Sequence, residues 1–339
     1  MASSTIKDIA RRAGLSIATV SRVINGNYPV SEESRKKVLL AIQELNYKPN
    51  AVARSLKTES THTIGILVSD IANPFFMQIA KAVENVVSKN HYNIIVCSSE
   101  EDEEKEIRYL KMLFEKRVDG IILSPSGKGN LLAKELETSD IPVVLIDRTI
   151  KGLDLDTVAE DSYKGAYMLI RYLLSLGHTE IAIIDGPHSS STGCERLKGY
   201  LDALEHSGQR AKESLIRCGN YTMEYGYDEA CKLFKGDNTF TAIFAANNLI
   251  AKGVIAAARD MGRSIPDDFS LVCFGEKELV RLVNPPVTCI MQKPMEIGLK
   301  AGEIVMERIT GKKSNIQSMI LPPEIYVGGS CKEIKRTRD

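Results

Sequence analysis

From residue 63 onward, short apolar runs alternate with longer segments of helical spacing. The runs are rich in β-branched and aliphatic residues and lie at Ile64–Val68, Asn93–Cys97, Gly120–Leu123 and Val143–Ile146. The segments between them repeat apolar residues at helical spacing and lie at Phe75–Lys89, Glu101–Arg117 and Leu131–Leu136. A continuous apolar strand is buried on both faces, and a helix that joins two such strands makes a parallel crossover. The pattern therefore predicts βαβ units around a buried parallel sheet.

The same alternation begins again after Val158. Predicted helices lie at Tyr163–Leu176, Thr192–His206, Met223–Phe234 and Leu249–Met261, and predicted strands lie at Ile181–Ile184, Thr241–Ala245 and Ser270–Phe274. The body is therefore expected to form two doubly wound α/β lobes. Ligands of open α/β sheets bind beyond the carboxyl ends of the strands. Polar residues stand at these ends, namely Asp70, Asp147, Arg148, Asp185, Asn247 and Glu276, which predicts a ligand cleft between the lobes.

Composition excludes several classes of protein. The 339 residues are 43% hydrophobic and 26% charged, which is typical of globular proteins and not of disordered or fibrous chains. No run reaches the roughly 18 apolar residues of a membrane span, and the first twenty residues lack a signal-peptide stretch. We therefore expect a cytoplasmic protein without a membrane partner. The seven cysteines are irregularly spaced and are expected to be reduced thiols, mostly in the core.

Charge is unevenly divided along a chain whose formal net charge is zero. Residues 1–60 contain ten Lys or Arg and five Asp or Glu, so the excess of positive charge lies at this end. A local positive excess is typical of a surface that binds phosphates. The first 60 residues are therefore predicted to bind nucleic acid.

The basic segment begins with the pattern of two short helices separated by a turn at Gly14. Thr5 and Ser16 are suited to cap these helices, and Ile9 and Val20 are suited to their buried faces. In such a helix-turn-helix unit the second helix lies in the major groove. Ile17 and Ala18 are then expected at apolar base edges and Arg22 at a guanine, although Arg22 is also consistent with a solvated surface charge. Candidate DNA contacts of this unit are Thr5, Ser16, Ile17, Ala18, Thr19, Ser21, Arg22 and Asn25.

A third helix from Ser31 is predicted to complete the small core. Pro49 then interrupts the chain, and Asn50 is suited to cap a short segment that ends at Leu56. This segment is too short to be a stable helix alone, so we expect it to order when something packs on it, such as a second copy on DNA. A less favoured alternative is that Leu56 only closes the core of the small domain.

Two segments closely resemble the LacI/GalR family of bacterial transcription regulators. They read T-I-K-D-I-A-R-R-A-G-L-S-I-A-T-V-S-R-V-I-N-G from Thr5 and L-N-Y-K-P-N-A-V-A-R-S-L from Leu45. The resemblance implies a homodimer on double-stranded DNA, with paired hinge helices in the minor groove at the centre of a palindromic operator, where a CG step is expected. Leu56 matches the minor-groove wedge of the family, and Asn50, Ala53 and Arg54 are further candidate DNA contacts.

The body also resembles periplasmic sugar-binding proteins and the regulatory core of the same family. This implies an all-α helix-turn-helix domain at residues 1–48, a hinge helix and linker at 49–62, and an effector-binding core at 63–339. The chain is expected to cross between lobes near Ser162, Ile290 and Leu321. Lobe 1 then comprises about 63–161 and 291–321, and lobe 2 comprises about 162–290 and 322–339.

Residues that match effector contacts of the family follow several predicted strands. They are Asn73, Phe75, Phe76, Arg148, Arg196, Asn247, Glu276 and Gln292. Aromatic rings can stack on a sugar and amides can bond vicinal hydroxyls, while the fork of Arg196 suits hydroxyls or a carboxylate. Alternatives remain: one of the two Phe residues is expected to serve only the core, and Asn247 is also suited to cap the next helix.

One departure from the family pattern bears on the effector. Many relatives carry an acidic pair where this chain has Gly275-Glu276, so Gly275 removes one sugar-binding acid. Because Arg148 and Arg196 remain, the balance favours an anionic sugar acid, such as a hexuronate or ketodeoxy sugar acid, over a neutral sugar. Two alternatives stay open here: Lys293 is either a third nearby cation or a solvated charge on the crossing after Gln292, and Glu276 is able to reach into the pocket in place of the lost acid.

Catalytic and metal-binding patterns are not evident in the sequence. The acids at 100–106 are best interpreted as the solvated start of a helix, where the helix dipole favours negative charge. The five histidines are scattered. We therefore predict no enzyme activity, no cofactor and no metal, and a repressor of a carbohydrate operon. A neutral sugar effector, a protein corepressor and, less favoured, a sugar-binding transport protein are the alternatives.

Overall fold

The computed structural model describes residues 4–25, 29–47, 60–127, 130–137, 139–237, 239–276, 281–312 and 315–334. The chain separates into two compact units, Met1–Thr61 and His62–Asp339. Each unit has its own hydrophobic core. In the described part of the chain, none of the helices combines the length and apolarity that a membrane span requires.

The first unit is a bundle of three short helices, α1 (Ile6–Ala13), α2 (Ile17–Asn25) and α3 (Glu32–Glu44). Ile9, Val20 and Val38 have no exposed surface and bring one residue from each helix into a common core. Gly14 ends α1 with φ +64°, a left-handed conformation that glycine adopts at no steric cost. The tight turn that follows places α2 against α1, as the helix-turn-helix pattern predicts.

The helix starts of this unit are capped by short polar side chains. Thr5 and Asp8 form a capping box, in which the Thr5 amide donates to Asp8 Oδ2 at 2.9 Å and the Asp8 amide donates to Thr5 Oγ1 at 3.4 Å. The hydrogen bonds from Thr5 lower the pKa of Asp8. The Thr19 amide donates to Ser16 Oγ at 3.1 Å, so Ser16 orders the start of α2.

The hinge segment lies outside the described residues. Asn50, Ala53, Arg54 and Leu56 all fall there, and the side chain of Asn25 also lies outside the description. The hinge helix and these DNA contacts therefore stay predictions.

The first lobe of the second unit contains a fully parallel sheet with strand order β11-β5-β4-β3-β1-β2. The strands are β1 (Thr63–Val68), β2 (Asn93–Ser98), β3 (Gly120–Leu123), β4 (Val143–Ile146), β5 (Asp156–Glu160) and β11 (Ser318–Leu321). Its helices are α5 (Pro74–Val87), α6 (Glu103–Glu115), α7 (Asn130–Glu137) and α13 (Pro294–Ile309), with a 3₁₀ turn at Ser88–Asn90.

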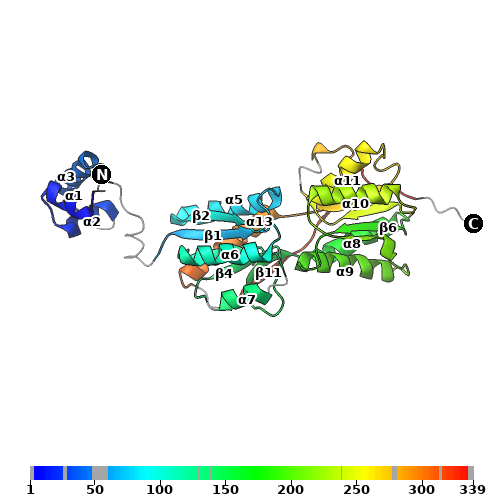
Figure 1. Cartoon of the computed structure of the whole chain (residues 1–339), viewed down its shortest axis with the longest axis horizontal. Helices are drawn as coiled ribbons and strands as arrows, with labels where there is room; N and C mark the ends of the chain where they lie inside the picture. The colour runs from blue at the N-terminus through cyan, green and yellow to red at the C-terminus, as the bar shows by residue number, and fades with distance from the viewer. Residues whose placement is uncertain are drawn as a thin grey trace, which may run out of the picture. The chain divides into compact units, whose positions relative to one another are not determined.

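Helices cover both faces of this sheet because its strands are apolar throughout. Ile64 and Ile66 face α5 and α13, whereas Leu67 faces α6 and α7. Figure 1 shows α5 and α13 on one side of the sheet and α6 and α7 on the other. Strand residues that alternate between two buried faces explain the continuous apolar runs of the sequence.

The second lobe has the strand order β12-β10-β9-β8-β6-β7. Its strands are β6 (Ile181–Asp185), β7 (Ile216–Cys218), β8 (Ala242–Ala245), β9 (Ser270–Gly275), β10 (Thr288–Met291) and β12 (Ile325–Tyr326). Its helices are α8 (Ser162–Ser175), α9 (Ser191–Glu205), α10 (Met223–Lys235) and α11 (Asn248–Asp260), with a 3₁₀ turn at Glu213–Leu215. The helices α10 and α11 cover one face, and α8 and α9 cover the other (Figure 1). The pairing is parallel except at β12, which runs antiparallel to β10.

The chain passes between the two lobes three times. It crosses between Glu160 and Ser162, between Met291 and Pro294, and between Leu321 and Ile325. The first crossing joins β5 to α8, and the second joins β10 to α13. Each lobe is thus built from segments that are distant in the sequence.

The cysteines differ from the expectation that most of them fill the core. All seven are free thiols, of which Cys97, Cys273 and Cys289 are buried. Cys194 and Cys218 are exposed, whereas Cys231 and Cys331 are half-buried. Cys194 lies in the first turn of α9 and Cys218 ends the edge strand β7, two exposed positions that the sequence pattern does not separate from core positions.

Candidate functional site

A cavity of about 210 Å³ lies between the carboxyl ends of the two sheets. Its lining comes from both lobes and comprises Ser69, Asp70, Asn73, Phe75, Phe76, Glu100, Glu101, Asp147, Arg148, Thr192, Arg196, Tyr221, Thr222, Asn247, Asn248 and Gln292. Pockets for drug-sized ligands usually span about 300 to 1,000 Å³. The smaller volume suits a compound of about the size of a single sugar ring.

Seven of the eight effector residues predicted from the sequence line this cavity, and Glu276 does not. Glu276 is 3% exposed and accepts hydrogen bonds from Asn248 Nδ2 at 2.8 Å and from Gln78 Nε2 at 3.3 Å. Lys252 Nζ lies 3.4 Å from the same carboxylate. Its acceptor atoms thus serve contacts within the protein, one of them with the opposite lobe.

Arg148 lies at the cavity with its charge already compensated. Its Nη1 and Nη2 atoms both donate to the Glu101 carboxylate at 2.7 Å, and Nη1 also donates to the Pro125 carbonyl at 3.1 Å. Burial lowers the pKa of Arg148, but the hydrogen bonds and charge of Glu101, together with Asp147, outweigh this effect and raise it. Arg148 therefore adds no net positive charge to the cavity.

The acidic run is not a uniformly solvated helix start. Glu101 adopts φ +59° and turns its carboxylate to Arg148. Glu106 has no exposed surface and accepts a hydrogen bond from the Ser126 amide at 2.8 Å. Burial raises the pKa of Glu106 to about 7. The interpretation of this run as surface charge is therefore wrong for these two residues, because their partners are distant in the sequence.

Arg196 is a buried cation at the cavity that has carboxylates in its surroundings but no direct ion pair. It is 4% exposed, its Nη1 donates to the Ala246 carbonyl at 2.8 Å, and its guanidinium lies 4.0 Å from the Phe274 ring centre. Its Nε atom is buried without a hydrogen-bond partner. Among the described residues, no carboxylate forms an ion pair with Arg196.

Lys293, the third cation considered in the sequence analysis, has its partners outside the cavity. Lys293 Nζ pairs with the Glu324 carboxylate at 2.5 Å and donates to the Pro322 carbonyl at 3.2 Å. The excess of positive charge at the cavity is therefore smaller than expected, because Arg148 and Lys293 each have a carboxylate partner. Of the two cations among the described lining residues, Arg196 is the one without a direct ion pair.

The remaining predicted residues line the cavity but also have structural roles. Asn73 caps α5 by accepting from the Phe75 amide at 3.1 Å, and Asn247 caps α11 by accepting from the Ile250 amide at 2.8 Å. Phe75 and Phe76 are both 4% exposed and belong to the same core cluster, so the structure does not divide them into a ligand contact and a core residue. Gln292 is half-buried beside Glu160.

Several lining residues were not predicted from the sequence. Tyr221 is 7% exposed, and its ring lies 5.5 Å from the Arg148 guanidinium and 5.9 Å from that of Arg196. Burial raises the pKa of Tyr221 to about 12. It follows β7, whose three residues are too few to give a recognisable apolar run. Thr192 contributes from the first turn of α9, and its Oγ1 lies 3.4 Å from the Tyr221 hydroxyl.

The predicted DNA-reading residues lie on or before α2. Ile17 is 46% exposed, and Ala18 and Arg22 are also exposed. Thr19 and Ser21 are half-buried, while Ser16 and Thr5 are engaged in helix capping. An exposed apolar residue at the first helical position is consistent with contact to thymine methyls.

Two family models match this chain. Residues 5–50 match the model described as bacterial regulatory proteins of the lacI family. Residues 61–335 match the model described as periplasmic binding proteins and the sugar-binding domain of the LacI family. The chain belongs to the LacI family. As a member, it is a DNA-binding transcriptional regulator with a ligand-binding domain.

Relatives and solved structures in the LacI family resemble this chain along nearly its whole length. It is 37% identical to the HTH-type transcriptional regulator DegA of Bacillus subtilis, over 96% of this chain and 97% of that protein. It is 36% identical to the HTH-type transcriptional repressor PurR of Vibrio campbellii, over 98% and 99%. The structure of the lac repressor dimer bound to operator and the anti-inducer ONPF superposes with a TM-score of 0.84 at 24% identity, covering 98% and 100% of the chains.

Proposed function

We propose that this LacI-family regulator is a homodimeric repressor of a carbohydrate catabolic operon, controlled by a small sugar-type effector that carries a carboxylate. The repressor role is supported by the name of the PurR relative, and the sugar-type effector is supported by the description of the family model that matches residues 61–335. The operator is proposed to be palindromic with a central CG step, contacted by α2 and by the segment that contains Leu56. The effector is proposed to bind the cavity described above.

The observation that carries the effector proposal is the unpaired charge of Arg196. A buried cation is normally paired with a carboxylate, because an uncompensated charge in a desolvated site is costly. Arg196 has one carbonyl partner and an unsatisfied Nε atom, and both lie at a cavity that is large enough for one sugar ring. A ligand carboxylate would accept from this guanidinium and neutralise it, as planar arginine forks favour.

A neutral sugar is the second candidate, and it is supported by the other polar groups of the cavity. Asp70, Glu100 and Asp147 line it together with Glu101, so its lining contains more acids than bases. Burial raises the pKa of Asp147, which moves this carboxyl toward its neutral form. Hydroxyl groups would donate to such acids without adding charge.

Fluorescence anisotropy on a labelled duplex tests the proposal. The duplex is first selected from a randomised library of palindromes by its affinity for the protein, which also tests the central CG step. Galacturonate is then compared with galactose, because these two differ in the carboxylate at C6. A ketodeoxy sugar acid, a purine base and other neutral sugars complete the set. We expect a sugar acid to change the DNA affinity while its neutral counterpart does not.

Two variants on α9 separate the carboxylate contact from a general charge effect. Arg196→Gln removes the unpaired cation and should weaken the response to a sugar acid by at least about tenfold, the equivalent of 1.4 kcal/mol. Lys198→Gln is the matched control, because Lys198 is exposed on the same helix and does not line the cavity. Equal responses to acids and neutral sugars would refute the carboxylate. Tight operator binding with no response to any small molecule would instead support a protein corepressor.

A further inference from the structure

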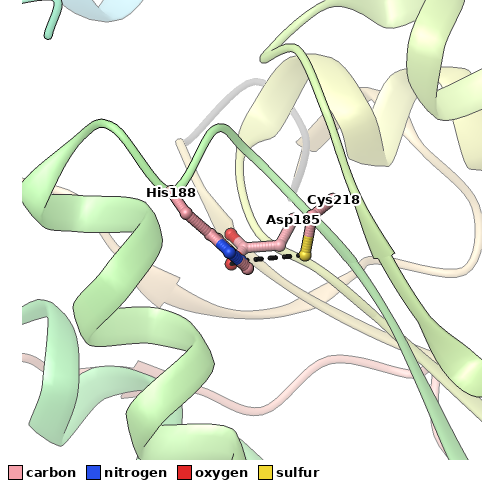
Figure 2. Close-up of side chains that lie close together, drawn as sticks. All are labelled: Asp185, His188 and Cys218. Carbon is pink, nitrogen blue, oxygen red and sulfur yellow. Dashed lines mark hydrogen bonds and ion pairs between the residues drawn. The ribbon is translucent and has the colours of Figure 1, made fainter. Parts of the chain in front are cut away.

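Three side chains with metal-binding atoms meet beside the second sheet. They are Asp185, His188 and Cys218, whose ligand atoms all lie within 4.8 Å of one another (Figure 2). The His188 Nε2 atom lies 2.9 Å from Cys218 Sγ and 4.0 Å from Asp185 Oδ2. Cysteine and histidine spacing in the sequence predicts no metal site, because it cannot show that residues 30 positions apart become neighbours.

The strand register explains this meeting. Asp185 is the last residue of β6 and Cys218 is the last residue of β7, and the two are direct partners in the parallel ladder. The Gly219 amide donates to the Asp185 carbonyl at 3.1 Å, which continues the ladder past the strand ends. His188 follows three residues after Asp185, in a turn closed by the bond from the Ser190 amide to the Pro187 carbonyl at 3.1 Å. The backbone therefore holds all three side chains at one edge of the sheet.

Asp185 has an acceptor atom without a donor. The residue has no exposed surface, and although Oδ1 accepts from the Gly186 amide at 2.8 Å, Oδ2 is buried without a hydrogen-bond partner. Figure 2 shows this carboxylate beside the imidazole of His188 and the sulfur of Cys218. Buried polar atoms normally have a partner, and this carboxylate oxygen has the electron pairs to bind a cation that reaches it from the side of His188 and Cys218.

We propose that Asp185, His188 and Cys218 bind a Zn²⁺ ion, with the fourth position open to water. A thiolate, an imidazole and a carboxylate are the ligands that zinc takes in proteins, and three protein ligands leave one position of the tetrahedron free. Zinc-to-ligand bonds of this kind place ligand atoms about 3.3 to 3.6 Å apart. The separations of 2.9 Å and 4.0 Å that His188 Nε2 makes with Cys218 and Asp185 must each change by roughly 0.7 Å to reach this geometry, which the exposed His188 and Cys218 side chains can accommodate.

The site adjoins the effector cavity through a glycine. A Cβ atom at Gly186 would overlap the ring of Tyr221, so the loop that carries His188 packs directly on a residue that lines the cavity. An ion that fixes this loop would also fix Tyr221. The zinc site does not depend on the identity of the effector.

Zinc binding to the full-length protein tests the proposal. Competition with a chromophoric chelator measures Zn²⁺ affinity, and Co²⁺ reports a thiolate ligand by its charge-transfer absorption in the near ultraviolet. We expect one high-affinity ion per chain, with affinity at least about tenfold lower in Cys218→Ser and in His188→Gln. The cobalt–thiolate absorption should disappear in Cys218→Ser.

Cys194→Ser is the matched control. Cys194 is the other exposed thiol of the described residues, and its Sγ donates to the His188 carbonyl at 3.1 Å, a bond that serine can replace. This variant should bind zinc as tightly as the unaltered chain. The proposal is overturned if the unaltered chain binds no zinc, if Cys218→Ser binds zinc with unchanged affinity, or if Cys194→Ser loses affinity to the same extent. Asp185→Asn, which keeps the size of the side chain, should also weaken binding, and unchanged affinity there would remove Asp185 from the site.

Discussion

Asn73 and Asn248 bond to each other across the two lobes. Asn248 Nδ2 donates to Asn73 Oδ1 at 3.0 Å, and Asn73 Nδ2 lies 3.4 Å from Asn248 Oδ1. Asn248 also donates to Glu276, which in turn accepts from Gln78 of the first lobe. Buried amide pairs of this kind hold two surfaces in one register, so these residues connect the lobes beside the effector cavity.

Asn248→Ala should weaken this connection. The substitution removes the donor to both Asn73 and Glu276 and leaves a buried carboxylate with fewer partners. We expect the free energy of unfolding of the second unit to fall by about 1 to 3 kcal/mol, as for a buried polar group left unsatisfied. Urea denaturation monitored by circular dichroism measures this change. An unchanged denaturation midpoint would mean that the connection contributes no stability.

Glu101→Gln should destabilise the second unit by removing the bidentate counter-charge of the buried Arg148 guanidinium, which then keeps only the Asp147 carboxylate, 3.6 Å from its Nε atom. Breaking a fully buried pair costs roughly 3 to 5 kcal/mol, and we expect about 2 kcal/mol here because the Glu101 side chain is 21% exposed. Glu104→Gln is the control, since Glu104 is exposed in the same run. Equal denaturation midpoints for the two variants would contradict a stabilising role of the Arg148–Glu101 pair.

Arg22→Ala should reduce sequence preference in the operator. Arg22 is exposed on α2, where a guanidinium can bond the major-groove edge of guanine. We expect a loss of about 1 to 3 kcal/mol on the selected operator and relaxed preference at one base pair. Anisotropy titrations on single-base variants of the operator measure both effects. A base-reading role would be refuted if specific and nonspecific duplexes lost affinity equally.

Glu160 should make stability depend on pH. Burial raises the pKa of this carboxyl from its ordinary value of 4.5 to about 7, against the effect of the hydrogen bond from the Lys293 amide. Between these two values the folded chain keeps a proton that the unfolded chain releases, so the free energy of unfolding falls as pH rises through this window. The cost above the window is on the order of 3 kcal/mol.

Glu160→Gln removes this titration. The free energy of unfolding of the variant, relative to the unaltered chain, should therefore rise from pH 4 to pH 8 by an amount on the order of 3 kcal/mol. Denaturation series at several pH values compare the two proteins. Glu106 and Asp185 also have a pKa raised to about 7, so the difference between the proteins is the informative quantity. Parallel pH curves would show that Glu160 does not titrate as described.

The fold class was predicted correctly because the patterns of apolar residues that indicate it are local and periodic. The buried runs at Ile64–Val68 and Val143–Ile146 needed only to be continuous and apolar to identify parallel strands. The edge strands β7 and β12 were not predicted, since three and two residues are too few to show a pattern. The reversed direction of β12 depends on a return of the chain after the last crossing, which local sequence does not specify.

The site was harder to predict because its charges depend on distant partners. Arg148 was correctly expected beside a strand end. Its neutralisation by Glu101 depends on the positive φ of Glu101, which cannot be predicted from a run of acidic residues. Arg196 was assigned from a resemblance to the family, and Asn247 from its place after a predicted strand together with that resemblance; their contact with an effector stays a prediction. Asp185 and Cys218 are neighbours because of the register between β6 and β7, and this register could not be predicted from the sequence.

The three crossings between the lobes restrict how the protein can be divided and how it can move. A fragment that stopped before Ser162 would lack α13 and β11, which complete the first lobe, so neither lobe is obtainable as one continuous piece of the natural chain. Hinge closure about a few connecting residues is a common motion of two-lobed proteins, and the three crossings are the only covalent links between these lobes in the described residues. A ligand held between the lobes would therefore act on the backbone angles of these short connections.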